Sequence, residues 1–207
     1  MQGLIAQGRG EAFDYLLGEK TTKPARDAAF AAAGALLSAK NPVISVNGNT
    51  AALCPKEIIG LADAVNAKIE VNLFYRSGER EEKIAAVFRK LGRGIFGVNP
   101  DSKIEGLCSE RAKVSGGGIG KADVVLVALE DGDRTDALRK AGKKVIAIDL
   151  NPLSRTAQTA DITIADNVVR AIPLITLMAK KAGKTGKKFD NRKNLGEALK
   201  LIRKGFG

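Results

Sequence analysis

The chain has 207 residues, of which 34 are Lys or Arg and 23 are Asp or Glu, so its formal net charge is +11. A chain of this length buries roughly 70% of its unfolded surface, so it can build a core without disulfides or metals. It contains no histidine, which excludes histidine general-base catalysis and most zinc or haem sites. Its two cysteines, Cys54 and Cys108, lie far apart, which is typical of a protein in a reducing, cytoplasmic compartment.

The first half of the chain predicts two helices followed by strands. Residues 10–18 and 24–40 have helical patterns, and the second stretch is rich in alanine, with Pro24 near its first turn. Short β-branched runs bounded by turn residues then predict five strands, and residues 94–98 are compatible with a further one. The five strands are expected at residues 42–47, 68–74, 123–129, 143–149 and 161–165.

Helices are predicted between and after these strands. They are expected at residues 50–66, with Pro55 in the first turns, and at residues 79–91, 134–141, 167–181 and 194–204. The glycine-rich residues 116–120 predict a flexible joint. This alternation indicates an α/β fold, with a mainly parallel sheet, helices on both faces, and helical extensions at both termini. We expect a single α/β domain, with a helical N-terminal part (1–41), a core (42–166) and C-terminal helices with a basic tail (167–207).

The positive charge is concentrated at the C-terminal end. Residues 180–207 carry ten Lys and Arg side chains against two acidic ones, which is +8 and leaves +3 for residues 1–179. Such segments often bind nucleic acid or another polyanion. Only Phe189 and Phe206 interleave the charges and no recognition motif precedes them, so nucleic-acid binding is not favoured as the main role. A solvent-exposed helix face explains the same charges.

No segment indicates a membrane or secreted protein. The longest apolar runs, at residues 124–129 and 171–179, are far shorter than the roughly 20 residues that span a bilayer. Residues 1–10 lack a basic-then-apolar signal pattern. We therefore expect a cytoplasmic protein with no membrane partner.

Polar residues follow the predicted strands, and ligands of an open parallel sheet lie beyond the carboxyl ends of its strands. Asn47 and Asn49 belong to a glycine turn that leads into a helix, where free N–H groups favour an anion, and an ordinary Asn N-cap explains them equally well. Arg76 and Arg80 follow the next strand, where a surface turn is the alternative explanation. These positions are therefore candidates for binding a phosphorylated ligand.

Acidic residues follow the strand at residues 123–129. Glu130, Asp131 and Asp133 are three carboxylates within four residues. We expect Asp133 to cap the next helix, whereas Glu130 and Asp131 are suited to orient Mg²⁺ through water or to hold an amine. The last predicted strand ends in Asp166 and Asn167.

The loop after residues 143–149 is the strongest candidate for a binding site. An aspartate at a strand end, here Asp149, can accept a hydrogen bond from a ribose hydroxyl. Arg155 stands beside Ser154 and Thr156, a combination that matches phosphate oxygens in charge and geometry. A binding role is favoured over a structural one for this loop.

The common glycine signatures of nucleotide binding are absent. Gly183, Lys184 and Thr185 resemble the end of a P-loop, but Met178 stands where the first glycine belongs, and the segment follows a helix. Residues 116–120 do not follow a strand and do not fit the dinucleotide fingerprint. A nucleotide would therefore be bound without these motifs.

Six strings, spread in order over almost the whole chain, resemble archaeal phosphopantothenate synthetase, the 4-phosphopantoate:β-alanine ligase family. They are residues 2–15 (QGLIAQGRGEAFDY), 42–49 (PVISVNGN), 71–76 (VNLFYR), 122–127 (ADVVLV), 130–134 (EDGDR) and 148–157 (IDLNPLSRTA). Several of them are long and rich in uncommon residues, which argues against a chance match.

The resemblance implies a Rossmann-like core, a homodimer and an ATP-dependent ligase of coenzyme A biosynthesis. In the implied reaction the carboxylate of 4-phosphopantoate is adenylated with release of pyrophosphate. The amine of β-alanine then displaces AMP to give 4-phosphopantothenate, and Mg²⁺ is expected with the ATP. The protein supplies positioning and electrostatic stabilisation and needs no covalent nucleophile, so the lack of histidine is compatible with this chemistry.

The resemblance also implies site residues, although it singles out neither a catalytic residue nor a protein metal ligand. The implied ATP contacts are Arg9, Asp149, Leu150, Asn151, Arg155, Thr156, Asp166 and Asn167. We extend the site by placing 4-phosphopantoate near Asn47, Asn49 and Arg76, and Mg²⁺ or β-alanine near Glu130, Asp131 and Arg134. The family's N-terminal segment, with one more ATP-contacting arginine, has no counterpart before residues 2–15.

Two other classes of function stay open at this point. A nucleotide-binding sensor would use the same pocket without turnover. A polyanion-binding protein would act through the basic residues of the C-terminal tail.

Overall fold

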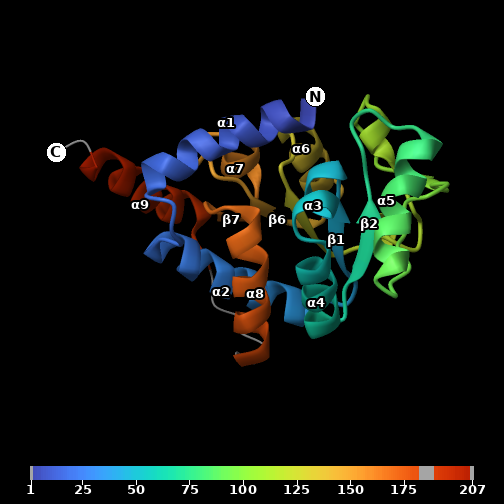
Figure 1. Ribbon diagram of the computed structural model, residues 1–207, viewed down its shortest axis with the longest axis horizontal. Coiled ribbons are helices and arrows are strands. Elements are labelled where there is room, and N and C mark those ends of the chain that lie inside the picture. The colour runs from blue at the N-terminus through green and yellow to red at the C-terminus, as the bar shows by residue number, and fades with distance from the viewer. Residues whose placement is uncertain (1, 182–188, 206–207) are drawn as a thin grey trace.

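The computed structural model describes residues 2–181 and 189–205, with side chains from residue 8 onward (Figure 1). The P-loop-like residues 183–185 and part of the basic tail lie outside the described residues. Five parallel strands form one sheet in the order β2-β1-β5-β6-β7, which confirms the predicted α/β, Rossmann-like fold. The strands are β1 (Pro42–Val46), β2 (Lys68–Val71), β5 (Val124–Ala128), β6 (Lys144–Ile148) and β7 (Ile162–Ile164).

Helices occupy the predicted stretches between the strands, and their starts follow from side chains that cap free N–H groups. The hydroxyl of Thr22 accepts from Ala25, and that of Ser77 accepts from Arg80. The α-helices are α1 (Gln2–Leu17), α2 (Lys23–Ser38), α3 (Gly48–Leu53), α4 (Pro55–Val65), α5 (Gly78–Lys90), α6 (Gly132–Lys140), α7 (Arg155–Thr159), α8 (Val168–Lys181) and α9 (Asn191–Lys204).

Three helix predictions need correction. The stretch at residues 50–66 is two helices, because Pro55 lacks an N–H and forces Cys54 out of the helical region, to φ −148° and ψ 46°. The first helix begins at Gln2 rather than near residue 10. Asp131, and not Asp133, caps α6, because its carboxylate accepts from the N–H of Arg134 at 2.8 Å.

The segment between α5 and β5 also differs from the prediction. Residues 94–98, which are compatible with a further strand, form only one bridge, between Phe96 and Glu70 of β2. A short antiparallel pair, β3 (Ser102–Lys103) and β4 (Lys113–Val114), was not predicted. Two-residue strands are too short to show a periodic pattern.

The predicted flexible joint at residues 116–120 is a fixed turn. The carboxylate of Glu70 accepts from the N–H of Ser115 at 2.9 Å and of Ile119 at 2.7 Å. A side chain at Gly118 would collide with this carboxylate, so glycine is required there for close approach. The 3₁₀ helix η1 (Glu110–Ala112) precedes β4, and η2 (Ile119–Lys121) follows at the end of the turn and leads toward β5.

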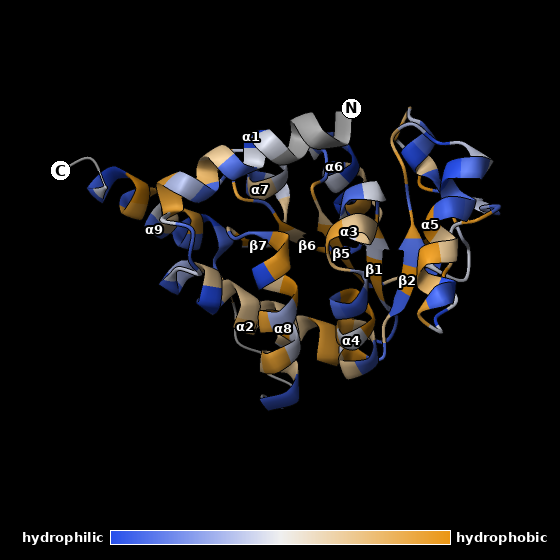
Figure 2. Cartoon of the chain, viewed as in Figure 1, coloured by the Kyte–Doolittle hydropathy of each residue, from blue (hydrophilic) through white to orange (hydrophobic). Residues whose placement is uncertain are grey.

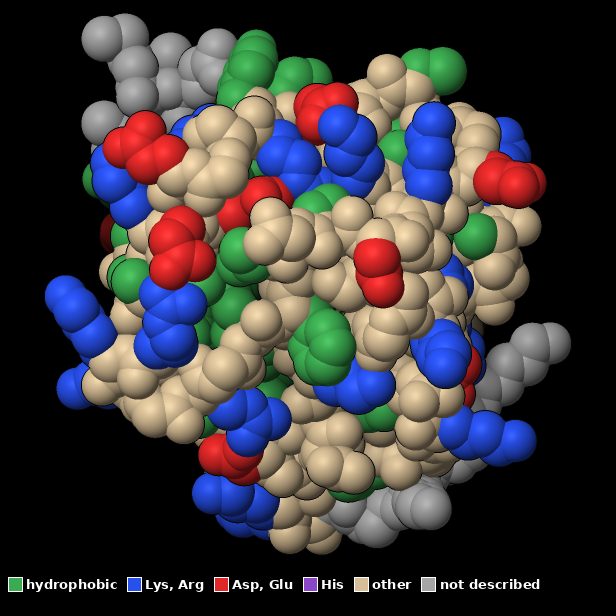
Figure 3. Space-filling model, turned by 90° about the vertical axis from the view of Figure 1, so that its right-hand side faces the viewer, with side chains coloured by type: hydrophobic (Ala, Val, Ile, Leu, Met, Phe, Trp, Pro, Cys, Tyr) green, Lys and Arg blue, Asp and Glu red, His purple; other side chains and the backbone are tan. Residues whose placement is uncertain are grey.

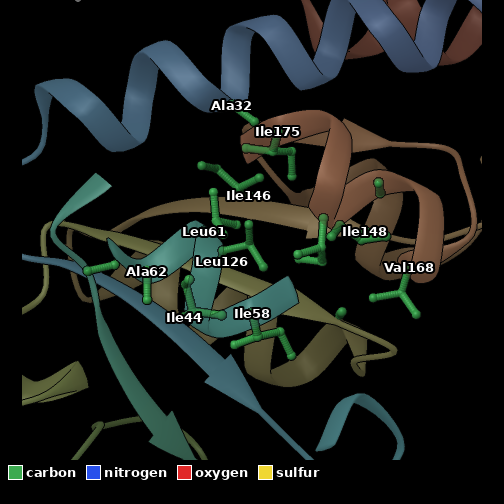
Figure 4. Close-up of a cluster of buried hydrophobic side chains, with 14 of the residues drawn as sticks. Ala32, Ile44, Ile58, Leu61, Ala62, Leu126, Ile146, Ile148, Val168 and Ile175 are labelled. Carbon is green, nitrogen blue, oxygen red and sulfur yellow. The ribbon is translucent and has the colours of Figure 1, made fainter. Parts of the chain in front are cut away.

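The sheet has an apolar layer on each face. Ile44 of β1 lies in register with Ile69 and Leu126, and this face packs against α2, α4 and α8 (Figure 4). Val43 and Val125 point to the opposite face, which is covered by α6 and residues 104–122. Hydrophobic residues accordingly gather along the strands and on the inner sides of the helices (Figure 2). Continuous burial of this kind is expected for strands covered on both faces.

Candidate functional site

The order of the strands reverses at β1 and β5, so a crevice is expected at their carboxyl ends. The chain passes from β1 to β2 on one side of β1, and later returns through β5 on the other side. Loops at such a reversal diverge and leave room for a ligand. The helix α1 lies across this edge of the sheet, near the N-terminal ends of α3 and α7 (Figure 1).

A pocket of about 460 Å³ lies between α1 and the loops that follow β5 and β6. Its volume is in the range that holds small-molecule ligands. It is lined by Arg9, Gly10, Ala12, Phe13, Leu129, Glu130, Asp149, Leu150, Asn151 and Ser154. The structure thus brings together five of the predicted residues, which are Arg9, Glu130, Asp149, Leu150 and Asn151.

The loop after β6 holds Asp149 in a fixed orientation. Its carboxylate accepts from the hydroxyl of Ser154 at 2.5 Å and from the N–H of Asn151 at 3.0 Å. Burial raises the pKa of Asp149, and these two hydrogen bonds oppose the rise. The hydroxyl of Ser154 also accepts from Ala157 and so caps α7. Asp149 is therefore a preorganised acceptor on the wall of the pocket.

The opposite wall and the floor of the pocket combine charge with apolar surface. Arg9 and Phe13 project from α1 into the lining, and Arg9 supplies a cation. Leu129, at the end of β5, has a left-handed backbone with φ +53°, which non-glycine residues seldom adopt. A ligand in this pocket would meet apolar side chains together with a cationic side chain and a carboxylate.

Arg155 and Thr156 do not line the pocket. Arg155 lies beside it and pairs with Asp133 at 2.5 Å, with both side chains 70% exposed. The hydroxyl of Thr156 donates to the carbonyl of Glu130 at 2.9 Å, which ties the loop after β6 to the loop after β5. A side chain at Gly132 would collide with Arg155, so this glycine permits the close approach of the two loops.

Asp166 and Asn167 lie beneath α1 rather than in the pocket lining. The carboxylate of Asp166 accepts from the hydroxyl of Thr21 at 2.6 Å and from Arg170 at 2.8 Å. The amide of Asn167 donates to Asp14 of α1 at 3.1 Å. In this arrangement the side chains of both residues are used in contacts within the protein, to α1, to Thr21 and to α8.

Asn47 is the N-cap of α3, which was the alternative to a role in binding an anion. Its Oδ1 accepts from the N–H groups of Asn49 and Thr50, and its Nδ2 donates to the carbonyl of Ala128 at 2.9 Å. It thus joins the ends of β1 and β5. The side chain of Asn49 is half-buried at the same edge.

Glu130 has a buried carboxylate that is paired on both oxygens. Arg134 of α6 and Arg111 contact one oxygen each. Arg134, which is 1% exposed, also donates to the hydroxyl of Ser45 at 3.1 Å, and Arg111 reaches Asp131 at 3.3 Å. Burial lowers the pKa of both arginines to about 10, which leaves them charged at neutral pH. Glu130 is therefore committed to arginine pairs and does not fit the expected role toward Mg²⁺ or an amine.

Arg76 is also committed to internal contacts. It pairs with the buried Glu81 and donates to the carbonyls of Lys113 at 2.7 Å and Gly97 at 2.9 Å. It therefore fixes the loop after β2 against the segment before β5, away from the pocket lining.

Sequence reasoning missed Arg111 and Arg170. Neither follows a predicted strand, and each is recognised only through partners that are distant in sequence.

Among the described residues, no group of three or more His, Cys, Asp and Glu side chains could hold a metal ion. On the face beside β2 and α5, Lys and Arg side chains are interspersed with acidic ones and form no uniform basic patch (Figure 3). No described helix is both long and apolar enough to cross a bilayer.

Comparison with known proteins decides the family. A family model described as phosphopantothenate/pantothenate synthetase matches residues 24–205. The chain belongs to this family. The family match covers the whole sheet and the loops after β5 and β6, and α1 lies outside it.

Archaeal members of the phosphopantothenate/pantothenate synthetase family are similar to this chain over nearly its full length. A Thermococcus onnurineus protein named 4-phosphopantoate–β-alanine ligase is 56% identical, over 97% of this chain and 81% of its own. The protein of that name from Thermococcus kodakarensis is 54% identical over the same shares. That from Methanosarcina mazei is 50% identical, over 98% of this chain and 83% of its own.

Proposed function

We propose that this chain condenses 4-phosphopantoate with β-alanine in an ATP-dependent reaction of coenzyme A biosynthesis. The family membership and the name that three relatives share support this activity. The reaction would proceed through an acyl-adenylate, with release of pyrophosphate and then AMP. The single structural observation that carries the proposal is the pocket that is lined by both Arg9 and the fixed carboxylate of Asp149.

In this proposal ATP occupies the pocket beneath α1. Asp149 accepts a hydrogen bond from a ribose hydroxyl, Asn151 contacts the base or sugar, and Arg9 neutralises phosphate charge. Arg155, at the adjacent rim, reaches phosphates by leaving its exposed pair with Asp133. Mg²⁺ enters as the counter-ion of the ATP phosphates, because the described residues offer no grouped ligands for it.

The two acids bind along the same edge, toward β1. Asn49 presents its half-buried side chain there, and we place 4-phosphopantoate beside it. Asn47, Arg76, Asp131 and Arg134 then act by shaping the crevice, since their side chains hold caps and buried ion pairs. We further propose that the protein works as a cytoplasmic homodimer, which light scattering of the purified chain would measure.

The test is release of AMP and pyrophosphate that requires both 4-phosphopantoate and β-alanine. Arg155→Ala should abolish this release if Arg155 neutralises ATP phosphates. The matched control is Arg139→Ala, which removes an arginine that pairs with Asp161 at 3.0 Å and is not part of the pocket. Wild-type rates in Arg155→Ala would refute the role of Arg155.

Other outcomes would point to other functions. ATP binding without substrate-dependent turnover would indicate a nucleotide sensor. A main activity that is lost on removal of residues 184–207, and that weakens steeply with salt, would indicate a polyanion-binding protein.

A further inference from the structure

Over residues 8–17, whose side chains the structure describes, the helix α1 forms a wall of the pocket and buries few apolar side chains. Among its side chains from residue 8 onward, Asp14 and Leu17 are the buried ones. Leu16 is exposed, and Tyr15 is 72% exposed. Most helices of a globular protein are held by an apolar face. Over these residues α1 therefore has few apolar contacts to hold it, and its polar contacts matter correspondingly more.

A buried polar cluster beneath α1 supplies these contacts. The carboxylate of Asp14 accepts from Arg170 at 2.5 Å and from the amide of Asn167 at 3.1 Å. The same amide donates to Glu11 at 3.0 Å, one turn earlier on α1. Arg170 lies in the first turn of α8, and Asn167 is the residue just before this helix. The cluster therefore joins α1 to the helix that follows β7.

Arg170 is the central cation of this cluster. Its guanidinium contacts Asp166 at 2.7 Å as well as Asp14, and both carboxylates are buried. Burial alone would lower the pKa of Arg170, but its hydrogen bonds to Asp14 and Asp166 outweigh burial and raise it. Without this cation, two buried carboxylates would face each other, and their repulsion would push α1 away from α8.

The geometry of α1 links this cluster to the pocket. Arg9 and Phe13 line the pocket, and Phe13 is the neighbour of Asp14. Gly10 lies one turn before Asp14 and packs against Leu150 of the pocket, since a Cβ at Gly10 would stand 3.5 Å from the Leu150 side chain. A shift of the helix at Asp14 therefore moves the cation and the aromatic ring that the pocket presents to its ligand.

We propose that Asp14 and Arg170 are positioning residues that hold α1 as the wall of the nucleotide pocket. The proposal rests on the proposed function, in that the pocket takes ATP. Neither residue lines the pocket, so both act through Arg9 and Phe13. Loss of the pair should weaken ATP binding more than it slows the chemical step.

The experiment compares Arg170→Met and Asp14→Asn with the control Arg139→Met in the full chain. Amide hydrogen exchange is followed by mass spectrometry over residues 8–17 and over β5 and β6. In Arg170→Met we expect exchange of α1 to rise about tenfold while β5 and β6 are unchanged. The KM for ATP should rise about tenfold with kcat within about threefold of wild type.

Asp14→Asn should show the same changes to a smaller degree, because Arg170 keeps its pair with Asp166. This variant also decides the question if Arg170→Met does not fold. Arg139→Met should match the wild type in every measurement. Unchanged exchange of α1 in both variants would overturn the proposal, and so would an equal rise in α1, β5 and β6.

The two proposals fail in different ways. If the wild type shows no ATP binding by calorimetry, the proposed function is wrong, whereas hydrogen exchange still tests the hold on α1. If ATP binds and α1 exchanges normally in both variants, the positioning proposal alone is wrong.

Discussion

The two sides of the carboxyl edge use similar residues for different purposes. On the β6 side, Asp149 and Arg9 face a pocket of about 460 Å³. On the β2 side, Arg76 is buried against Glu81, and Arg111 and Arg134 are buried against Glu130, a residue that also lines the pocket. A charged residue beyond a strand can thus serve a ligand or neutralise another buried charge. Its burial and its partners distinguish the two roles.

The sharpest way to break this comparison is to remove a buried cation on the β2 side. In Arg134→Met the buried carboxylate of Glu130 loses one of its two arginine partners. We expect the free energy of unfolding, measured in urea, to fall by about 3–5 kcal/mol. Arg139→Met, which removes a half-exposed arginine, should cost about 0–1 kcal/mol. Equal effects of the two substitutions would contradict the distinction.

A smaller effect is expected from Glu70→Gln. One amide oxygen would replace a carboxylate that accepts from two buried N–H groups, so unfolding should become easier by about 1–3 kcal/mol. Burial raises the pKa of Glu70 above its ordinary value of 4.5. The carboxyl group of Glu70 therefore stays protonated to a higher pH in the folded protein than in the unfolded chain.

The contribution of Glu70 to stability must therefore decrease as pH rises from 4.5 through the raised pKa. Urea titrations of wild type and Glu70→Gln at several pH values measure this dependence. The difference between their free energies of unfolding should shrink over that range and then level off. Parallel curves would show that Glu70 does not titrate differently in the two states.

The smallest effect on stability, with the clearest effect on binding, is expected on the β6 side. Asp149→Asn keeps an oxygen that can accept from Ser154 or Asn151, so stability should fall by only about 1 kcal/mol. Loss of the charged acceptor should weaken ATP binding about tenfold in calorimetry. Arg76→Met, in contrast, should lower the free energy of unfolding and leave the affinity for ATP unchanged. Binding losses of the same size in both variants would remove the contrast between the two sides.

Local pattern was sufficient to predict much of the fold. The short run of β-branched and apolar residues that became β5 is typical of a strand, and the turn residues around it marked its ends. The break before Pro55 was also visible in principle, because proline disfavours helix at the residue before it. Within the site, Asp149 and Asn151 were predictable because the end of a parallel strand fixes where a side chain can reach.

The remaining features depend on pairs that are distant in sequence. Arg111 meets Glu130 only after residues 104–122 have folded back over the sheet. Glu70 looks like one polar residue of an alternating strand, yet it fixes the turn at Gly118. No periodicity reveals which charge will be buried beside which, so the structural roles of Arg76 and Arg134 could not be separated from binding roles.

The backbone of Leu129 has a further consequence. A left-handed conformation strains a leucine by roughly 1 kcal/mol or more, whereas a glycine would adopt φ +53° without strain. The advantage of leucine at this position must then come from its side chain, in the lining of the pocket. Part of the folding free energy is thus given up to place an apolar side chain in the lining of the pocket.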